Sequence, residues 1–315
     1  MSLALVFPGQ GSQRPGMGKP LAEAFAAARE VFEAVDDALS EHLSRTIFDG
    51  PEADLTDTRN AQPALLAVSM AVLAVLRREG GFTPAANAAY VAGHSLGEYG
   101  ALAAAGSFSL ADAARTLRAR GEAMQRAAPG DGGAMTAVLG GDFAAIESVA
   151  AAAAAETGGI CVVANDNAPG QVVLSGTSAA IERAEALARE AGAKRAVRLG
   201  VAAGFHSPLM APAAERMTDV LAALTLTPPD PPLVANVTAA PVRSPDEIRR
   251  LLVRQLTDRV RWRESVTALT GLGVETFVEV GAGKVLSGLA RRIAPDATAI
   301  SLESPEEIDA FLSSR

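Results

Sequence analysis

This sequence of 315 residues has little cysteine, few aromatic residues and no excess of positive charge. Its single cysteine, Cys161, excludes an intramolecular disulfide and a thiolate metal cluster. Because Cys161 lies in the apolar stretch 160–163, we interpret it as a buried and inert residue. Aromatic residues make up 4% of the chain, so the core is expected to consist mainly of aliphatic side chains.

The net charge is −8 and the isoelectric point is near 5.1. Nonspecific binding to nucleic acid requires a basic surface, so this charge argues against a nucleic-acid-binding protein. A local basic patch on the surface remains compatible with this negative net charge. No His-x-x-x-His motif and no dense carboxylate cluster is present to predict a metal site.

Long hydrophobic runs are also missing. The longest, residues 63–76, has 14 residues, fewer than the about 20 needed to span a bilayer, and predicts a buried core helix. The first ten residues, MSLALVFPGQ, lack the basic segment and cleavage site of a signal peptide. These features favour a cytoplasmic enzyme without a membrane segment.

Apolar runs of strand length alternate with segments of helical periodicity, which predicts an α/β fold with a mostly parallel sheet. The expected strands are residues 3–7, 88–92, 232–236 and 276–280. The expected helices include residues 17–38, 62–79 and 109–126.

The middle of the chain has a different order of expected elements, β-α-β-β-α-β, which is the ferredoxin-like arrangement. These elements are residues 132–140, 142–156, 159–166, 170–176, 177–192 and 194–200, with a turn at 167–170. We therefore predict a small ferredoxin-like subdomain over residues 130–201, inserted into a large catalytic α/β domain formed by residues 1–129 and 202–315.

The motif Gly93-His94-Ser95-Leu96-Gly97 lies between an expected strand and an expected helix, where Gly-x-Ser-x-Gly is typical of a nucleophile elbow. Glycines on both sides of Ser95 would avoid collisions in so sharp a turn. Ser95 would then project its hydroxyl at the carboxyl edge of the sheet, and Leu96 would direct its N–H to the same place. The alternative is a purely structural turn.

A serine nucleophile needs a base, and the chain has three histidines. His42 lies in a polar helical stretch and is interpreted as a surface residue. His94 adjoins Ser95, but neighbours on an elbow diverge, so it is expected to pack or hydrogen-bond beneath the turn. His206 precedes Ser207-Pro208, a pair that typically begins a helix, and by elimination it is the better base.

Arg120 falls on the edge of the apolar stripe of the helix expected at 109–126. An arginine that faces the interior needs an anion. It could form a structural ion pair, direct its charge outward along a buried aliphatic stem, or bind a substrate carboxylate through two donors of its guanidinium. The spacing alone favours none of these readings.

Three further segments carry weaker signals. In residues 8–13, PGQGSQ, the N–H of Gln10 could be a second oxyanion donor beside Leu96, or the segment could be a simple turn. Residues 281–285, GAGKV, lack the complete spacing of a phosphate loop, so a nucleotide site is not expected. The basic run 249–263 is interpreted as a solvated helix face, with a docking surface as the alternative.

Together, several motifs resemble the malonyl-CoA:acyl carrier protein transacylase family, the FabD-like acyltransferases. In chain order they are FPGQGSQ, NAQPALLAVS, GHSLGEY, RGEAMQ, NAPGQVVLSG, FHSPLM, RQLTDRVRW and EVGAGKVLSGL, and they span nearly the whole chain. The resemblance implies an α/β-hydrolase-like core with an inserted ferredoxin-like subdomain.

The same resemblance implies roles for individual residues. Ser95 would carry the acyl group, His206 would be its base, and Arg120 would bind the malonyl carboxylate. The N–H groups of Gln10 and Leu96 would form the oxyanion hole. The family glutamine whose backbone carbonyl orients the histidine corresponds to Gln255 here. No metal or cofactor is implied, since the CoA thioester is a substrate and the phosphopantetheine belongs to the partner.

One position departs from the family pattern: Gly204 stands where a proline usually precedes Phe-His, which would give the loop of His206 more freedom or widen the acyl site. Phe205 resembles the malonyl-selecting members. The expected partners are malonyl-CoA and holo-acyl carrier protein, an acidic protein that would dock on a basic patch near Lys284, Arg291 and Arg292.

The expected reaction is ping-pong transfer of malonyl through Ser95 in fatty-acid biosynthesis. The alternatives are an α/β-hydrolase esterase or thioesterase, an acyltransferase of a polyketide or malonate pathway, and a noncatalytic subunit that only binds the carrier protein.

Overall fold

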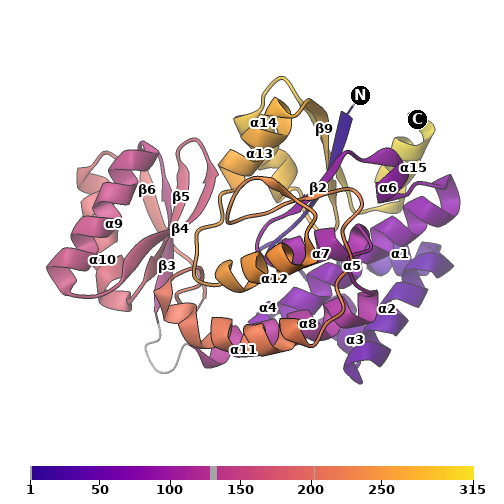
Figure 1. Ribbon diagram of the computed structural model, residues 1–315, viewed down its shortest axis with the longest axis horizontal. Helices are drawn as coiled ribbons and strands as arrows, with labels where there is room; N and C mark the ends of the chain where they lie inside the picture. Colours follow the sequence, from indigo (N-terminus) through magenta and orange to yellow (C-terminus); the bar gives the residue numbers. More distant parts are fainter. Residues whose placement is uncertain (1, 128–132, 202) are drawn as a thin grey trace.

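The computed structural model describes residues 2–127, 133–201 and 203–315. Two separate sheets organise them, and the antiparallel sheet with its two helices forms one end of the molecule, at the left of Figure 1. The predicted limits of the inserted subdomain, at 129/130 and 201/202, involve residues 128–132 and 202, which lie outside the described residues, as does the first residue of the strand expected at 132–140.

The larger sheet has the order β10-β9-β1-β2-β7-β8, and its strands are parallel except for β8. The strands are β1 Ser2–Phe7, β2 Tyr90–Gly93, β7 Leu233–Val234, β8 Pro241–Val242, β9 Val274–Val280 and β10 Thr298–Leu302. The prediction of an α/β fold with a mostly parallel sheet is therefore confirmed.

Helices cover both faces of this sheet (Figure 1). Those of the N-terminal part are α1 Lys19–Ala24, α2 Ala26–Leu39, α3 Leu43–Asp49, α4 Glu52–Thr56, α5 Thr58–Gly80, α6 Pro84–Asn87, α7 Gly97–Ala104 and α8 Leu110–Arg126. Those after residue 203 are the 3-10 turn η1 Pro208–Met210, α11 Ala211–Ala222, α12 Pro245–Arg254, α13 Trp262–Gly271, α14 Val285–Ile293 and α15 Pro305–Ser313.

The alternation of side chains along β1 divides the core between these faces. Leu5 and Phe7 join the cluster that contains Leu65 of α5, whereas Val6 joins the cluster that contains Trp262 of α13 and Leu286 of α14. Because both faces are covered, the central strands β1 and β2 are almost wholly apolar, as expected of a buried parallel sheet.

The second sheet is antiparallel with the order β4-β5-β3-β6. Its strands are β3 Ala134–Leu139, β4 Cys161–Ala168, β5 Gln171–Gly176 and β6 Arg195–Arg198, and helices α9 Phe143–Thr157 and α10 Ser178–Glu190 pack beside it. The predicted order β-α-β-β-α-β is confirmed. The turn expected at 167–170 is shorter, since β4 continues to Ala168. Cys161 is buried, and burial raises the pKa of its thiol to about 12.

Helix α5 is longer than the apolar run that predicted it. Asp57 caps its first turn by accepting from the N–H of Arg59, and Gly81 ends it with a φ of 63°. At 23 residues it has the length and apolar composition to cross a membrane, but 78% of its most apolar stretch is buried in the protein. It is the central core helix that the sequence predicted.

Two predictions of helices need correction. The helix expected at 17–38 is broken at Phe25, whose backbone is extended (φ −127°, ψ 125°) and separates α1 from α2. The basic run 249–263 is not one solvated helix face, because α12 ends at Arg254 and Trp262, at the start of α13, is buried.

The strands at the ends of the sheet were the hardest to predict. The strand expected at 232–236 is only the two residues of β7, and the sequence did not indicate β8 or β10. β10 is a partly exposed edge strand, so it lacks the continuous apolar run of the central strands.

Candidate active site

Ser95 lies in a sharp turn between β2 and α7, with a φ of 54° in the left-handed region. A Cβ on Gly93 would lie 1.9 Å from the backbone carbon of Gly97, and a Cβ on Gly97 would lie 2.2 Å from the carbonyl oxygen of Phe7. Neither position can therefore hold a larger residue, as the elbow reading requires. Because neighbouring strands are parallel, β1, β2 and β7 all end at this edge.

Asn236 stabilises this turn from the residues that follow β7. Its Oδ1 accepts from the N–H of Ser95 at 2.8 Å, and its Nδ2 donates to the carbonyl of Gly93 at 2.6 Å. A non-glycine residue at positive φ costs about 1–2 kcal/mol, which such contacts offset. The sequence analysis did not single out Asn236, although its place as the last, polar residue of the strand expected at 232–236 was a usable signal.

The hydroxyl of Ser95 contacts His206, since Oγ lies 2.8 Å from Nε2. The other ring nitrogen, Nδ1, lies 2.7 Å from the carbonyl oxygen of Gln255. A carbonyl can only accept, so Nδ1 carries the proton and Nε2 is left to accept from the serine. Burial, and next the positive charge of Arg120, lowers the pKa of His206 to about 3. The imidazole is therefore neutral at physiological pH.

A short hydrogen bond closes the turn that contains His206. His206 itself has a φ of 54°, and the hydroxyl of Ser207 donates to the carbonyl of Gly204 at 2.6 Å. A Cβ on Gly204 would lie 2.7 Å from a side-chain carbon of Leu209, so this position is closely packed.

The guanidinium of Arg120 also reaches the serine. Its side chain is 1% exposed, and one terminal nitrogen donates to Ser95 Oγ at 3.1 Å and to Gln255 Oε1 at 2.9 Å. The other donates to Gln62 Oε1 at 2.8 Å, and the Nε–H is buried without a hydrogen-bond partner. These contacts place a buried cation, with one donor to spare, against the nucleophile.

Glu98 and Tyr99 lie behind this guanidinium, and the sequence analysis missed both. The guanidinium carbon of Arg120 lies 5.6 Å from the ring centre of Tyr99. Glu98 is 1% exposed and accepts from the side-chain amide of Gln255. Burial raises the pKa of Glu98 to about 7, against the opposing effect of its hydrogen bonds and of Arg120.

The two N–H groups expected to form the oxyanion hole belong to the residue after Ser95 and to the loop that follows β1. Leu96 is the residue before α7, and the side chain of Gln10 is held by Thr58 at 3.1 Å. Within residues 2–127, 133–201 and 203–315, neither N–H has a hydrogen-bond acceptor.

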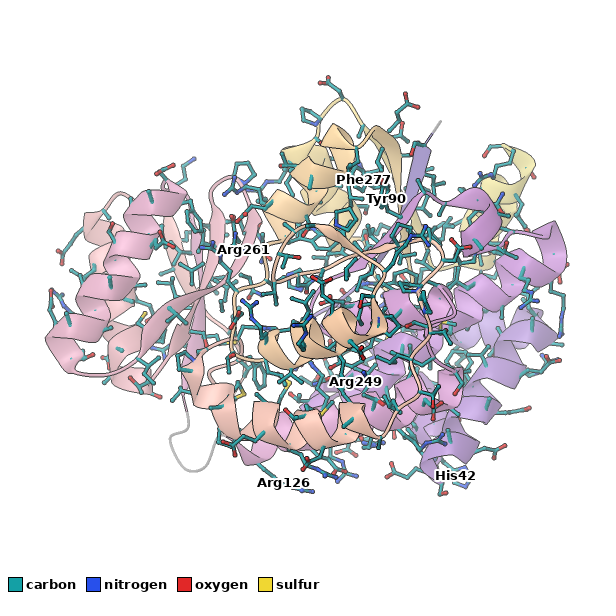
Figure 2. All side chains as sticks on the ribbon, viewed as in Figure 1. His42, Tyr90, Arg126, Arg249, Arg261 and Phe277 are labelled. Atoms are coloured by element: carbon teal, nitrogen blue, oxygen red, sulfur yellow. The ribbon has the colours of Figure 1, made fainter. Side chains whose placement is uncertain are left out.

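The other two histidines face away from this chemistry. His94 Nε2 lies 2.8 Å from Asn167 Oδ1 on β4, and its ring packs beside Trp262, which confirms the interpretation of a residue beneath the turn. His42 is exposed at the edge of the molecule, far from the sheets (Figure 2).

The segment 281–285 does not bind phosphate through the start of α14. That helix end is occupied by Glu279, whose buried carboxylate accepts from the N–H groups of Leu286 and Ser287 at 3.0 and 2.7 Å. In the described part of the chain, no cluster of three or more His, Cys, Asp or Glu side chains could hold a metal ion.

The basic residues expected to bind a carrier protein lie on and just before α14, and all three are exposed. Lys284 pairs with Glu307 at 2.8 Å. Arg291 donates to the carbonyl of Ala299, and Arg292 donates to the side chain of Gln171.

Residues 4–295 match the family model described as the acyl transferase domain. The chain is 46% identical over 307 residues to the malonyl CoA-acyl carrier protein transacylase of Bacillus subtilis (strain 168), covering 98% of this chain and 95% of that protein. The transacylase of the same description from Escherichia coli (strain K12) is 43% identical over 309 residues, with 98% of each chain covered.

Two solved structures are similar over the whole chain. The acyl-carrier-protein-S-malonyltransferase of Bartonella henselae has a TM-score of 0.97 and 52% identity, covering 100% of this chain and 99% of that one. A complex of a type II polyketide acyl-carrier protein with its malonyl-transacylase has a TM-score of 0.96 and 39% identity, with 100% of both chains covered.

Proposed function

The chain belongs to the acyl transferase domain family, and on that premise we propose that it transfers the malonyl group of malonyl-CoA to holo-acyl carrier protein. The chain covers the length of relatives that carry this description, and one similar solved structure is a complex with an acyl-carrier protein. The reaction belongs to fatty-acid synthesis, as the relatives' activity implies.

One observation carries the choice of acyl group. The guanidinium of Arg120 lies 3.1 Å from Ser95 Oγ and has a free, buried Nε–H. An acyl group on Ser95 would therefore lie against a positive charge that water does not screen. A malonyl group places a carboxylate two bonds from its thioester carbonyl, and a planar guanidinium binds a carboxylate through two donors.

The first half of the reaction follows from the Ser95–His206 contact. His206 Nε2 takes the hydroxyl proton while Ser95 Oγ attacks the thioester carbon of malonyl-CoA. The N–H groups of Gln10 and Leu96 donate to the oxyanion, and loss of one such donor typically costs about 10²–10³ in rate. The C–S bond then breaks, His206 returns the proton to the CoA sulfur, and malonyl-Ser95 remains.

The second half reverses these steps with another thiol. His206 takes the proton of the phosphopantetheine thiol, whose sulfur attacks malonyl-Ser95, and returns it to Ser95 Oγ as that group leaves. Gln255 supplies the carbonyl that keeps the proton of the neutral ring on Nδ1. No metal or cofactor is required, because the substrate thioester and these side chains supply every reacting group.

The finer structural assignments are part of the same proposal. The parallel sheet with its elbow supports an α/β-hydrolase-like core over residues 1–129 and 202–315, and the order β4-β5-β3-β6 supports a ferredoxin-like subdomain over residues 130–201. The exposed residues Lys284, Arg291 and Arg292 are proposed as the docking patch for the acidic carrier protein. A cytoplasmic location is part of the same proposal, and the burial of α5 supports only the absence of a membrane span at that helix.

The test is to mix the protein with malonyl-CoA and to measure its intact mass, followed by peptide mapping. We expect one malonyl group on Ser95, discharged when holo-acyl carrier protein is added, and no adduct on a Ser95→Ala variant. An adduct that decays to free malonate without the carrier protein would instead show a thioesterase. Binding of the carrier protein with no adduct would show a noncatalytic subunit.

A further inference from the structure

Arg120 is a buried cation whose charge must be balanced, because an uncompensated buried charge is strongly destabilising. Among the described residues it forms no salt bridge: its donors reach the amide oxygens of Gln62 and Gln255 and the hydroxyl of Ser95. Those oxygens are neutral. The compensating negative charge must therefore come from a group beyond the guanidinium's own contacts.

Glu98 in its ionised form supplies that charge across one amide group, and its pKa of about 7 makes that form available at and above neutral pH. Its Oε2 accepts from Nε2 of Gln255, while Oε1 of the same amide accepts from Arg120 at 2.9 Å. Burial is the largest cause of both shifts, since it raises the pKa of Glu98 and lowers the pKa of Arg120; the attraction between the two charges opposes each shift. The carboxylate of Glu98 is thus linked through the amide of Gln255 to the guanidinium of Arg120. That guanidinium donates to the hydroxyl of Ser95.

We propose that Glu98 is a positioning residue for malonyl transfer: it orients the side-chain amide of Gln255, which in turn holds Arg120 against Ser95. The inference rests on the proposed function, since it concerns how Arg120 is positioned to bind the malonyl carboxylate. A carboxylate in direct contact with Arg120 would compete with the substrate for the same donors. Placed one amide away, Glu98 balances the charge and leaves the Nε–H free.

The orientation of the amide depends on the carboxylate for a specific reason. Glu98 meets two donors, Nε2 of Gln255 on one oxygen and the backbone N–H of Asn236 on the other, at 3.4 Å. An ionised carboxylate accepts at both oxygens, whereas a glutamine at this position offers one acceptor for two donors. The Gln255 amide could then turn its NH₂ toward Arg120, where two donors would face each other.

The main chain of Gln255 extends this effect to the base. Its carbonyl oxygen holds His206 Nδ1 at 2.7 Å, and its Nε2 also donates to the carbonyl of Ser95 at 2.9 Å. Gln255 is fully buried at the end of α12, so both contacts come from one fixed residue. The side chain of Gln255 thus serves the carboxylate-binding arginine, and its backbone serves the histidine.

The experiment measures kcat/KM for malonyl-CoA and acetyl-CoA, each with holo-acyl carrier protein, in the wild type and in Glu98→Gln. We expect the malonyl value to fall by about tenfold or more, the effect of one misplaced charged hydrogen bond, and the acetyl value to change much less. The ratio of the two values is the readout, because a general loss of folded protein lowers both together.

A double-mutant cycle tests whether Glu98 acts through Arg120. The double variant Arg120→Ala/Glu98→Gln should have the same malonyl-to-acetyl ratio as Arg120→Ala alone. A second full drop in the ratio would overturn the proposal. The control is Glu279→Gln, which changes another buried carboxylate, one that accepts from the N–H groups of Leu286 and Ser287, and it should leave the ratio unchanged.

Glu98→Asp is made alongside in case Glu98→Gln does not fold, since it keeps both acceptor oxygens on a shorter side chain. The malonyl-to-acetyl ratio of Glu98→Asp should fall less than the ratio of Glu98→Gln. If Glu98→Gln is unfolded, the comparison is with Arg120→Ala, whose ratio should fall further than that of Glu98→Asp. A wild-type ratio in folded Glu98→Gln would overturn the proposal. Failure of the proposed function looks different, because the wild type itself would then form no malonyl-Ser95.

Discussion

Replacing Arg120 by alanine should convert the protein from a malonyl-selective to an acyl-tolerant enzyme. The guanidinium, 1% exposed and 3.1 Å from Ser95 Oγ, is positioned to offer the substrate carboxylate one or two charged hydrogen bonds. Each is worth about 1.5–3 kcal/mol, so kcat/KM for malonyl-CoA should fall by about 10- to 150-fold per bond. The value for acetyl-CoA, which has no carboxylate, should change much less.

The assay is steady-state transfer from each donor to the same holo-acyl carrier protein. Arg115→Ala is the matched control, because Arg115 lies on the same helix but is exposed and pairs with Asp112. An unchanged malonyl-to-acetyl ratio in Arg120→Ala would refute the carboxylate-binding role.

The pH dependence of the same variant gives an independent check. The charge of Arg120 is the second-largest cause, after burial, of the low pKa of His206. Its removal should raise that pKa, and activity requires the neutral imidazole. The acidic limb of acetyl transfer should therefore move to higher pH in Arg120→Ala, and a limb that stays in place would contradict the coupling.

Three further predictions concern stability and the turn. His206 has a folded pKa of about 3, below its unfolded value of about 6.5, so its contribution to stability is present above pH 6.5 and is lost as the pH falls toward 3. Thermal unfolding should show the wild type losing about 2 kcal/mol relative to His206→Gln between pH 7.5 and pH 5; a constant difference would count against the shifted pKa. Asn236→Ala leaves two buried backbone groups unpaired, so it should lower the free energy of unfolding by about 1–3 kcal/mol for each and reduce kcat, as measured by denaturation and malonyl transfer; wild-type values for both would argue against its support of the turn. Gly97→Ala should abolish malonylation of Ser95, whereas Gly271→Ala, which meets nothing within 4 Å, should retain it.

The sequence predicted those parts of the site that depend on local chain geometry. The elbow at Ser95 follows from glycines at two fixed positions, and the inward direction of Arg120 follows from helical periodicity. His206 emerged only by elimination, because nothing local to its loop shows that it lies 2.8 Å from a residue 111 positions earlier.

The polar residues around Arg120 could not be found in this way. Glu98 and Gln255 are 157 positions apart, and Gln62 and Arg120 are 58 apart, so their contacts depend on how the helices pack on the sheet. Gln62 directly precedes the apolar run 63–76, which is typical of a core helix, and the sequence gives no sign of its polar partner. The break between α1 and α2 was missed because Phe25 is apolar and fits the helical pattern of the residues before and after it.

The contact of His94 with Asn167 ties the two sheets together directly beneath the nucleophile. Beside it, the buried carboxylate of Asp166 pairs with Arg263 at 2.6 Å, and Asn165 forms an isolated bridge with Val260. The antiparallel segment is consequently not an interchangeable module. A chimera that imports this segment from another protein would keep the shape of the turn only if the graft preserved Asp166 and Asn167 of β4.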